Sequence, residues 1–225
     1  LFYGTNTSTT GSVEKWFDYL EKPDEMNWDG NLEIELPEYP DVTFRWYPEK
    51  MDAVTGNEVT QLYTGMPIWN TYFCDLTGDG FPDLCSTLTI GSGIIDSRII
   101  VYDYANGASY TLEDRGKYDY SLRLNETDGC LWVVKKAYNS DDIVASGKLL
   151  FADNCLRVAY TLYETHKFTS VTIRNDGEDT LRITIGSDEK DLAVGEETSL
   201  AYTDFALRTI KLSSFGELDY TVTYD

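Results

Sequence analysis

The chain has 225 residues, of which 42% are apolar and 14% aromatic, so it can bury a real core and is not a disordered protein. Its formal net charge of −21 argues against nucleic acid as a partner and against anionic membrane surfaces, because both require clustered lysine and arginine. No apolar run is long enough to predict a transmembrane helix. The 17 tyrosines and 5 tryptophans favour strands, since flat side chains pack well on a pleated sheet.

The N-terminal segment is first polar and then amphipathic. Residues 1–11 are rich in Thr, Ser and Gly, and the chain begins with Leu rather than Met, so we expect a flexible tether with a covalent link to a membrane segment upstream. Ser12 can cap a short helix over residues 13–20. The apolar side chains of this segment have helical spacing: Val13, Trp16, Phe17 and Leu20.

From Leu32 the apolar period changes to two, which is typical of strands. Residues 12–164 are therefore predicted to form a larger antiparallel β-sheet domain, barrel-like or propeller-like, with one short N-terminal helix. Turn sequences such as Asn106-Gly107 and Asp128-Gly129 separate the strands. The predicted strands cover residues 32–36, 42–46, 58–63, 68–74, 84–90, 98–104, 109–113, 118–124, 130–135, 148–151 and 155–162.

The composition changes near residue 164. The segment 165–225 has no Trp and is rich in Thr, Ile and Val, which predicts a small β-sandwich domain that begins near residue 165. Its predicted strands cover residues 167–174, 180–186, 191–194, 198–202, 207–212 and 218–224. The whole chain is thus predicted to be all-β.

The motif with the sharpest chemical meaning is the acidic loop, residues 75–83, with the sequence DLTGDGFPD. Ca²⁺ prefers six to eight oxygen ligands, which such a loop supplies at alternate residues while a glycine at its sixth position allows a sharp turn. The predicted ligands are three carboxylates, one backbone carbonyl and one hydroxyl that binds directly or through water: Asp75, Asp79, Asp83, Phe81 and Thr77.

Two positions of the acidic loop differ from a helix-loop-helix calcium site. Its third position is Thr77 rather than Asp or Asn, and its twelfth is Ser86 rather than a bidentate Glu. These differences favour a calcium loop between two strands, in which the ion is structural. The alternative is an Asp-Gly hairpin turn without an ion, in which the crowded carboxylates would repel one another.

The four cysteines leave two interpretations open. Cys74 and Cys85 flank the acidic loop and can face each other across a hairpin, and Cys130 and Cys155 make the count even, so three pairings into two disulfides are possible. Alternatively, all four are small buried hydrophobic residues, which is usual for free cysteine.

No catalytic constellation is found, and we expect a protein that is not an enzyme. His166 is the single histidine, and its place near the predicted domain boundary favours a surface or linker role. Two Tyr-Asp-Tyr sequences offer a ligand-binding face for a glycan, or else their rings pack inward or decorate a solvated surface. The tyrosines concerned are Tyr102, Tyr104, Tyr118 and Tyr120.

The acidic loop is similar to the calcium-binding loop of FG-GAP repeats, here in a single copy. A longer pattern resembles an exported domain of Gram-positive gut bacteria, often the extracytoplasmic C-terminal part of membrane zinc peptidases that resemble β-lactam-sensing regulators. Besides the acidic loop, this resemblance depends on residues 32–40, 43–46, 65–70, 91–96 and 100–107. The zinc-peptidase motif H-E-x-x-H is absent from the chain, which has a single histidine.

The resemblance implies an extracellular, cell-surface or membrane-anchored module. We therefore expect a non-enzymatic sensor or ligand-binding ectodomain with a structural Ca²⁺ ion, whose partner is a small ligand, a glycan or a cell-surface protein. The alternative is a secreted carbohydrate-binding or adhesion module that uses the tyrosine-rich face.

Overall fold

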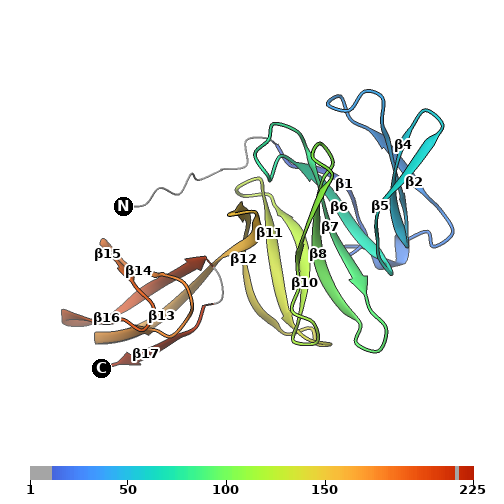
Figure 1. The fold of residues 1–225 in the computed structure, drawn as a ribbon. Coiled ribbons are helices and arrows are strands. Elements are labelled where there is room, and N and C mark those ends of the chain that lie inside the picture. The colour runs from blue at the N-terminus through green and yellow to red at the C-terminus, as the bar shows by residue number, and fades with distance from the viewer. Residues whose placement is uncertain (1–11, 216–217) are drawn as a thin grey trace. The chain divides into compact units, whose positions relative to one another are not determined.

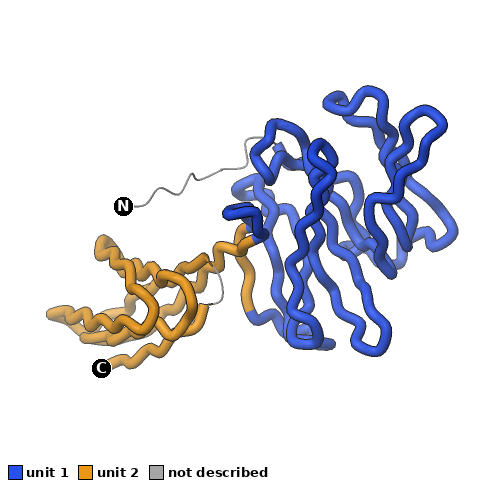
Figure 2. The backbone as a smooth tube through the Cα atoms, viewed as in Figure 1, with its two compact units in different colours: residues 1–144, 149–156 blue, residues 145–148, 157–225 orange. Residues whose placement is uncertain are grey.

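The computed structural model describes residues 12–215 and 218–225, so the predicted tether, residues 1–11, lies outside the described residues. The all-β prediction is confirmed: within the described ranges, the single helical element is a 3-10 turn, η1 (Pro23–Glu25). No helix in this part of the chain has the length and apolar character needed to cross a membrane. The chain divides into two compact units (Figure 2), residues 1–144 with 149–156 and residues 145–148 with 157–225. The predicted boundary near residue 165 lies inside one strand, β13 (Cys155–Asn175).

Unit 1 contains three groups of antiparallel strands (Figure 1). A four-stranded sheet has the order β2-β3-β4-β5, and a five-stranded sheet has the order β1-β6-β7-β8-β9. The strands β10, β11 and β12 are successive neighbours, and residues 145–148 of β12 are assigned to unit 2. No sheet closes into a barrel within the described ranges, so the barrel-like form is not observed. The bounds are β1 (Glu14–Asp18), β2 (Leu32–Glu35), β3 (Thr43–Tyr47), β4 (Lys50–Thr55), β5 (Glu58–Thr64), β6 (Ile68–Cys74), β7 (Asp83–Ile90), β8 (Asp96–Asp103), β9 (Ala108–Leu112), β10 (Tyr118–Asn125), β11 (Cys130–Ala137) and β12 (Ile143–Ala152).

The main core of unit 1 lies between the four-stranded and five-stranded sheets. Apolar side chains point into this core from both sheets, at alternate residues of each strand. They include Phe44 and Trp46 from β3, Phe73 from β6 and Leu84 from β7. The ring nitrogen of Trp46 donates to the carbonyl of Ile68 over 3.2 Å, so the largest buried ring also has its polar atom satisfied.

The predicted helix over residues 13–20 is wrong, because this segment forms strand β1. β1 pairs with β6, and a register shift between Lys15 and Phe17 leaves Trp16 outside the regular pairing. Trp16 and Phe17 then both contact the core, Trp16 against Phe73 and Phe17 against Trp46. A short isolated helix is marginal in water, whereas edge pairing satisfies the backbone of β1 and buries its aromatic rings.

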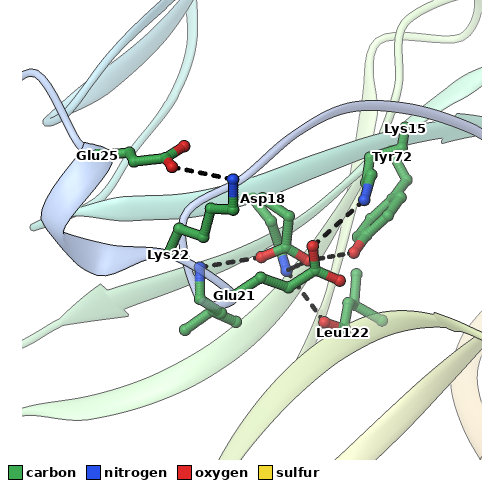
Figure 3. Close-up of polar contacts among 9 residues, drawn as sticks. Lys15, Asp18, Glu21, Lys22, Glu25, Tyr72 and Leu122 are labelled. Atoms are coloured by element: carbon green, nitrogen blue, oxygen red, sulfur yellow. Dashed lines mark hydrogen bonds and ion pairs between the residues drawn. The ribbon is translucent and has the colours of Figure 1, made fainter.

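A buried polar network joins β1, β6, β7 and β10, and Figure 3 shows its residues Asp18, Tyr72 and Leu122. Asn70 in β6 is fully buried, and its amide nitrogen donates to Asp18 Oδ2 over 3.3 Å and to the Leu122 carbonyl over 3.0 Å. Its carbonyl oxygen accepts from the backbone N–H of Thr87 over 2.9 Å. The Tyr72 hydroxyl also donates to Asp18. The network therefore fixes β10 on one face of the five-stranded sheet.

Unit 2 is built on two long strands, β13 and β16 (Glu197–Phe215), which pair along two stretches separated by a bulge between Phe168 and Ser170. In the first stretch β16 also pairs with β14 (Leu181–Ile185), which pairs with β15 (Asp188–Leu192). In the second stretch β13 also pairs with β17 (Tyr220–Tyr224). Both stretches contribute to one core, which includes Phe168, Val171, Ile183, Leu192 and Leu212. The two stretches are therefore not separate sheets, because β13 and β16 run through both.

Candidate metal site

The acidic loop connects the end of β6 to the start of β7, as the sequence predicts. Cys74 and Asp83 face each other as the last residue pair of the two strands. Gly78 and Gly80 have φ angles of 81° and 91°, a region that glycine enters without steric cost. The glycines therefore allow the short loop to turn back between two neighbouring strands.

The Asp75 carboxylate organises the first half of the acidic loop. Its Oδ1 accepts from the Gly78 N–H over 2.7 Å, and its Oδ2 accepts from the Gly80 N–H over 3.0 Å. Asp79 Oδ1 similarly accepts from the Phe81 N–H over 2.8 Å. Carboxylate oxygens have more than one lone pair, so these bonds leave acceptor capacity for a cation.

Asp83 is the buried carboxylate of the acidic loop, with an exposed fraction of 1%. Its Oδ2 accepts from the backbone N–H groups of Leu76 and Thr77, both over 2.8 Å, and its Oδ1 accepts from the Thr77 hydroxyl over 3.2 Å. Burial raises the pKa of Asp83 to about 7 against the opposing effect of these hydrogen bonds, and the negative charge of Asp103 raises it further. A neighbouring cation would favour the ionised form of this side chain.

Sequence reasoning missed Asp103 and Asn106, which lie beside the acidic loop. Leu84 pairs with Tyr102, so Asp83 and Asp103 occupy the adjacent ends of β7 and β8. The Asn106 amide nitrogen donates to Asp79 Oδ2 over 2.8 Å and to Asp103 Oδ2 over 2.9 Å. The antiparallel pairing of the two predicted strands was the signal that could have revealed them.

The Tyr39 hydroxyl is influenced by the charges of several carboxylates around the acidic loop. Its hydroxyl donates to the Pro82 carbonyl over 3.1 Å, and its ring stacks with Phe81 at a centroid distance of 5.8 Å. Burial raises the pKa of Tyr39, and the charges of Asp79, Asp83 and Asp103 raise it further. The negative charges of all three carboxylates therefore disfavour ionisation of the Tyr39 hydroxyl.

In the observed rotamers, no three Asp, Glu, His or Cys side chains among residues 12–215 and 218–225 converge on one metal position. The donor chemistry fits a hard cation, because the loop and its neighbour supply oxygen atoms from carboxylates, a hydroxyl and an amide. Metal binding would require the half-buried Asp75 and the exposed Asp79 side chains to turn towards Asp83.

The four tyrosines of the predicted ligand-binding face lie in different surroundings. Tyr102 and Tyr104 pack against the main core of unit 1, where Tyr104 contacts Phe44 at a centroid distance of 5.1 Å. Tyr120 is buried and donates to Asp114, and the Tyr118 ring lies 3.6 Å from the Lys135 ammonium group. All four rings thus take part in the packing of unit 1.

No protein-family model and no curated protein matches this chain.

His166 lies within β13 rather than in a linker. Its Nε2 is 3.6 Å from Glu164 Oε2, and its ring lies 4.4 Å from that of Tyr224. The Tyr220 and Tyr224 hydroxyls each donate to Glu164 over 2.6 Å. Because these bonds connect β17 to β13, this cluster has an evident structural role in unit 2.

Proposed function

We propose that this chain is a non-enzymatic, extracytoplasmic sensor or ligand-binding module in which one Ca²⁺ ion orders the acidic loop. The observation that carries the proposal is the burial of Asp83 beside Asp103, at the point where the acidic loop also presents Asp75 and Asp79. Adjacent carboxylates in a region of low polarity repel each other and favour a divalent cation between them.

The chemistry of the acidic loop favours Ca²⁺ over a transition metal. Its donors are oxygens, and the two buried thiols at its ends, Cys74 and Cys85, contact each other. The ligands in this proposal are the carboxylates of Asp75, Asp79 and Asp83, the Phe81 carbonyl, and Thr77 directly or through water. Extracellular calcium modules bind at about 0.1 to 1 mM, which suits an ion that holds a loop in place outside the cell.

The ion would act at the strand ends of the five-stranded sheet, where β6 is connected to β7, and would take no part in a reaction. Asn106 connects Asp79 to Asp103, so an ordered acidic loop also fixes the turn between β8 and β9. We propose that a small ligand, a glycan or a cell-surface protein binds to the surface formed by the acidic loop and the turn between β8 and β9. On the basis of the sequence resemblance, we also propose that the chain is attached to a membrane segment upstream.

Calcium titration calorimetry on the purified chain tests the proposal, with Mg²⁺ as a second titrant. We expect Ca²⁺ to bind at one site, to raise the melting temperature relative to chelator, and to lose at least tenfold in affinity in Asp79→Asn. Asp128→Asn changes an acidic residue in another turn, where it accepts from the Cys130 N–H, and serves as the matched control. Equal melting temperatures with Ca²⁺ and with chelator would refute the ion and leave an Asp-Gly hairpin.

A further inference from the structure

The two cysteines that flank the acidic loop are in contact. Cys74 ends β6 and Cys85 lies in β7, and their sulfur atoms are 3.7 Å apart. Cys74 pairs with Asp83 and Tyr72 pairs with Cys85, so the two thiols are diagonal neighbours on the same face of the sheet. Both are buried, with exposed fractions of 2% and 0%.

We propose that Cys74 and Cys85 form a disulfide that joins β6 to β7 and closes the base of the acidic loop. The inference goes beyond the proposed function, because the bond needs no Ca²⁺. A disulfide requires sulfur atoms about 2.0 Å apart, so the observed 3.7 Å must shorten by about 1.7 Å. Rotation of the two side chains about their Cα–Cβ bonds provides this approach.

The reaction is a thiol–disulfide exchange with a small disulfide oxidant such as glutathione disulfide. The thiolate of one cysteine attacks the oxidant, forms a mixed disulfide and releases one glutathione thiol. The thiolate of the second cysteine then attacks the protein sulfur of the mixed disulfide and releases the second. The two cysteines lose two protons and two electrons, and the oxidant becomes two thiols.

The exchange must take place before the hairpin is fully packed. A thiolate must reach the oxidant for the exchange to begin. In the folded chain the exposed fractions of Cys74 and Cys85 are 2% and 0%, so the oxidant has no access to either sulfur. Oxidation during folding avoids this obstacle.

The remaining cysteines provide an internal comparison. Cys155 is exposed and Cys130 is half-buried, with its sulfur 3.4 Å from the Asp128 carbonyl. Both are therefore open to thiol reagents in the folded chain, in contrast to Cys74 and Cys85. Their replacement by serine leaves one cysteine pair whose state can be read without ambiguity.

The test is oxidative refolding of the full chain that carries Cys130→Ser and Cys155→Ser. The chain is unfolded in reductant, refolded in a buffer of reduced and oxidised glutathione, and alkylated in denaturant. We expect an intact mass lower by two hydrogen atoms, no alkylation, and a cross-linked peptide that contains Cys74 and Cys85. The oxidised chain should melt several degrees above its reduced form.

Alkylation of both thiols after refolding in the oxidising buffer would overturn the proposal. If the double variant does not fold, the unmodified chain is refolded and its peptides are mapped. A Cys74–Cys85 peptide then supports the proposal, and a link from either residue to Cys130 or Cys155 contradicts it.

Discussion

Asn106 Nδ2 donates to Asp79 Oδ2 over 2.8 Å, although 27 residues separate the two in the chain. The bond places the turn after β8 against the acidic loop, and the same nitrogen donates to Asp103. A side chain that holds two carboxylates in place should influence any ion that they bind.

We therefore expect Asn106→Ala to weaken Ca²⁺ binding on the order of tenfold, because Asp79 and Asp103 lose the donor that orients them. Calorimetric titration measures the effect. The matched control is Asn125→Ala, since Asn125 accepts from the Thr127 N–H in a different turn. Equal affinities of Asn106→Ala and the unmodified chain would show that the orientation of Asp79 does not matter.

The backbone and the side chain of Phe81 have different roles, and one substitution can distinguish them. The proposed ligand is its carbonyl, whereas its ring stacks on Tyr39 at the surface. Phe81→Ala should therefore keep Ca²⁺ affinity within about twofold and lower the free energy of unfolding by about 1 kcal/mol through the lost ring contact. Titration and urea denaturation of one sample give both values. A large loss of affinity would mean that the ring itself shapes the site.

The buried network around Asn70 should be costly to disrupt. Asn70→Ala removes one side chain and leaves Asp18, the Leu122 carbonyl and the Thr87 N–H each without one partner. We expect a loss of about 3 kcal/mol in the free energy of unfolding, measured by urea denaturation. Asn27→Ala, in an exposed turn where Asn27 accepts from the Asp29 N–H, should change it by less than about 1 kcal/mol.

Glu164 should make unit 2 sensitive to acid. Burial would raise the pKa of Glu164, but hydrogen bonds from Tyr220 and Tyr224 and the neighbouring His166 together lower it below the ordinary value of 4.5. A lowered pKa contributes stability above pH 4.5, and this contribution is lost as the pH falls through the folded-state value.

The difference in free energy of unfolding between the unmodified chain and Glu164→Gln should therefore be largest near neutral pH and shrink in acid. Urea denaturation at a series of pH values measures it, with Glu178→Gln in an exposed turn as the control. A difference that is independent of pH would contradict an ionised Glu164.

Most strands could be predicted because their apolar residues alternate along the sequence. β4 was not predicted, because a buried charged residue, Asp52, interrupts its apolar pattern. Asp52 is buried there because it forms an ion pair with Lys50 over 2.6 Å. The segment of β1 was predicted as a helix for the opposite reason. Its spacing fits a helix, but pairing with β6 and a bulge at Trp16 decided its conformation.

The acidic loop could be located from its sequence because its ligand types lie within a few consecutive residues. Asp103 could not be identified in the same way, because only the pairing of β7 with β8 brings it beside Asp83. The surroundings of the tyrosines were equally hidden. Spacing places Tyr102 and Tyr104 on one side of a strand but does not say that the four-stranded sheet packs there.

The shared strands of unit 2 have a consequence for its dynamics. β13 and β16 each run through both stretches of the sheet, so neither stretch can lose its hydrogen bonds without disturbing the other. Backbone amides on either side of the Phe168–Ser170 bulge should exchange with solvent deuterium at similar rates, through a single cooperative opening. Unit 2 would then behave as one foldon, although two distinct stretches build it.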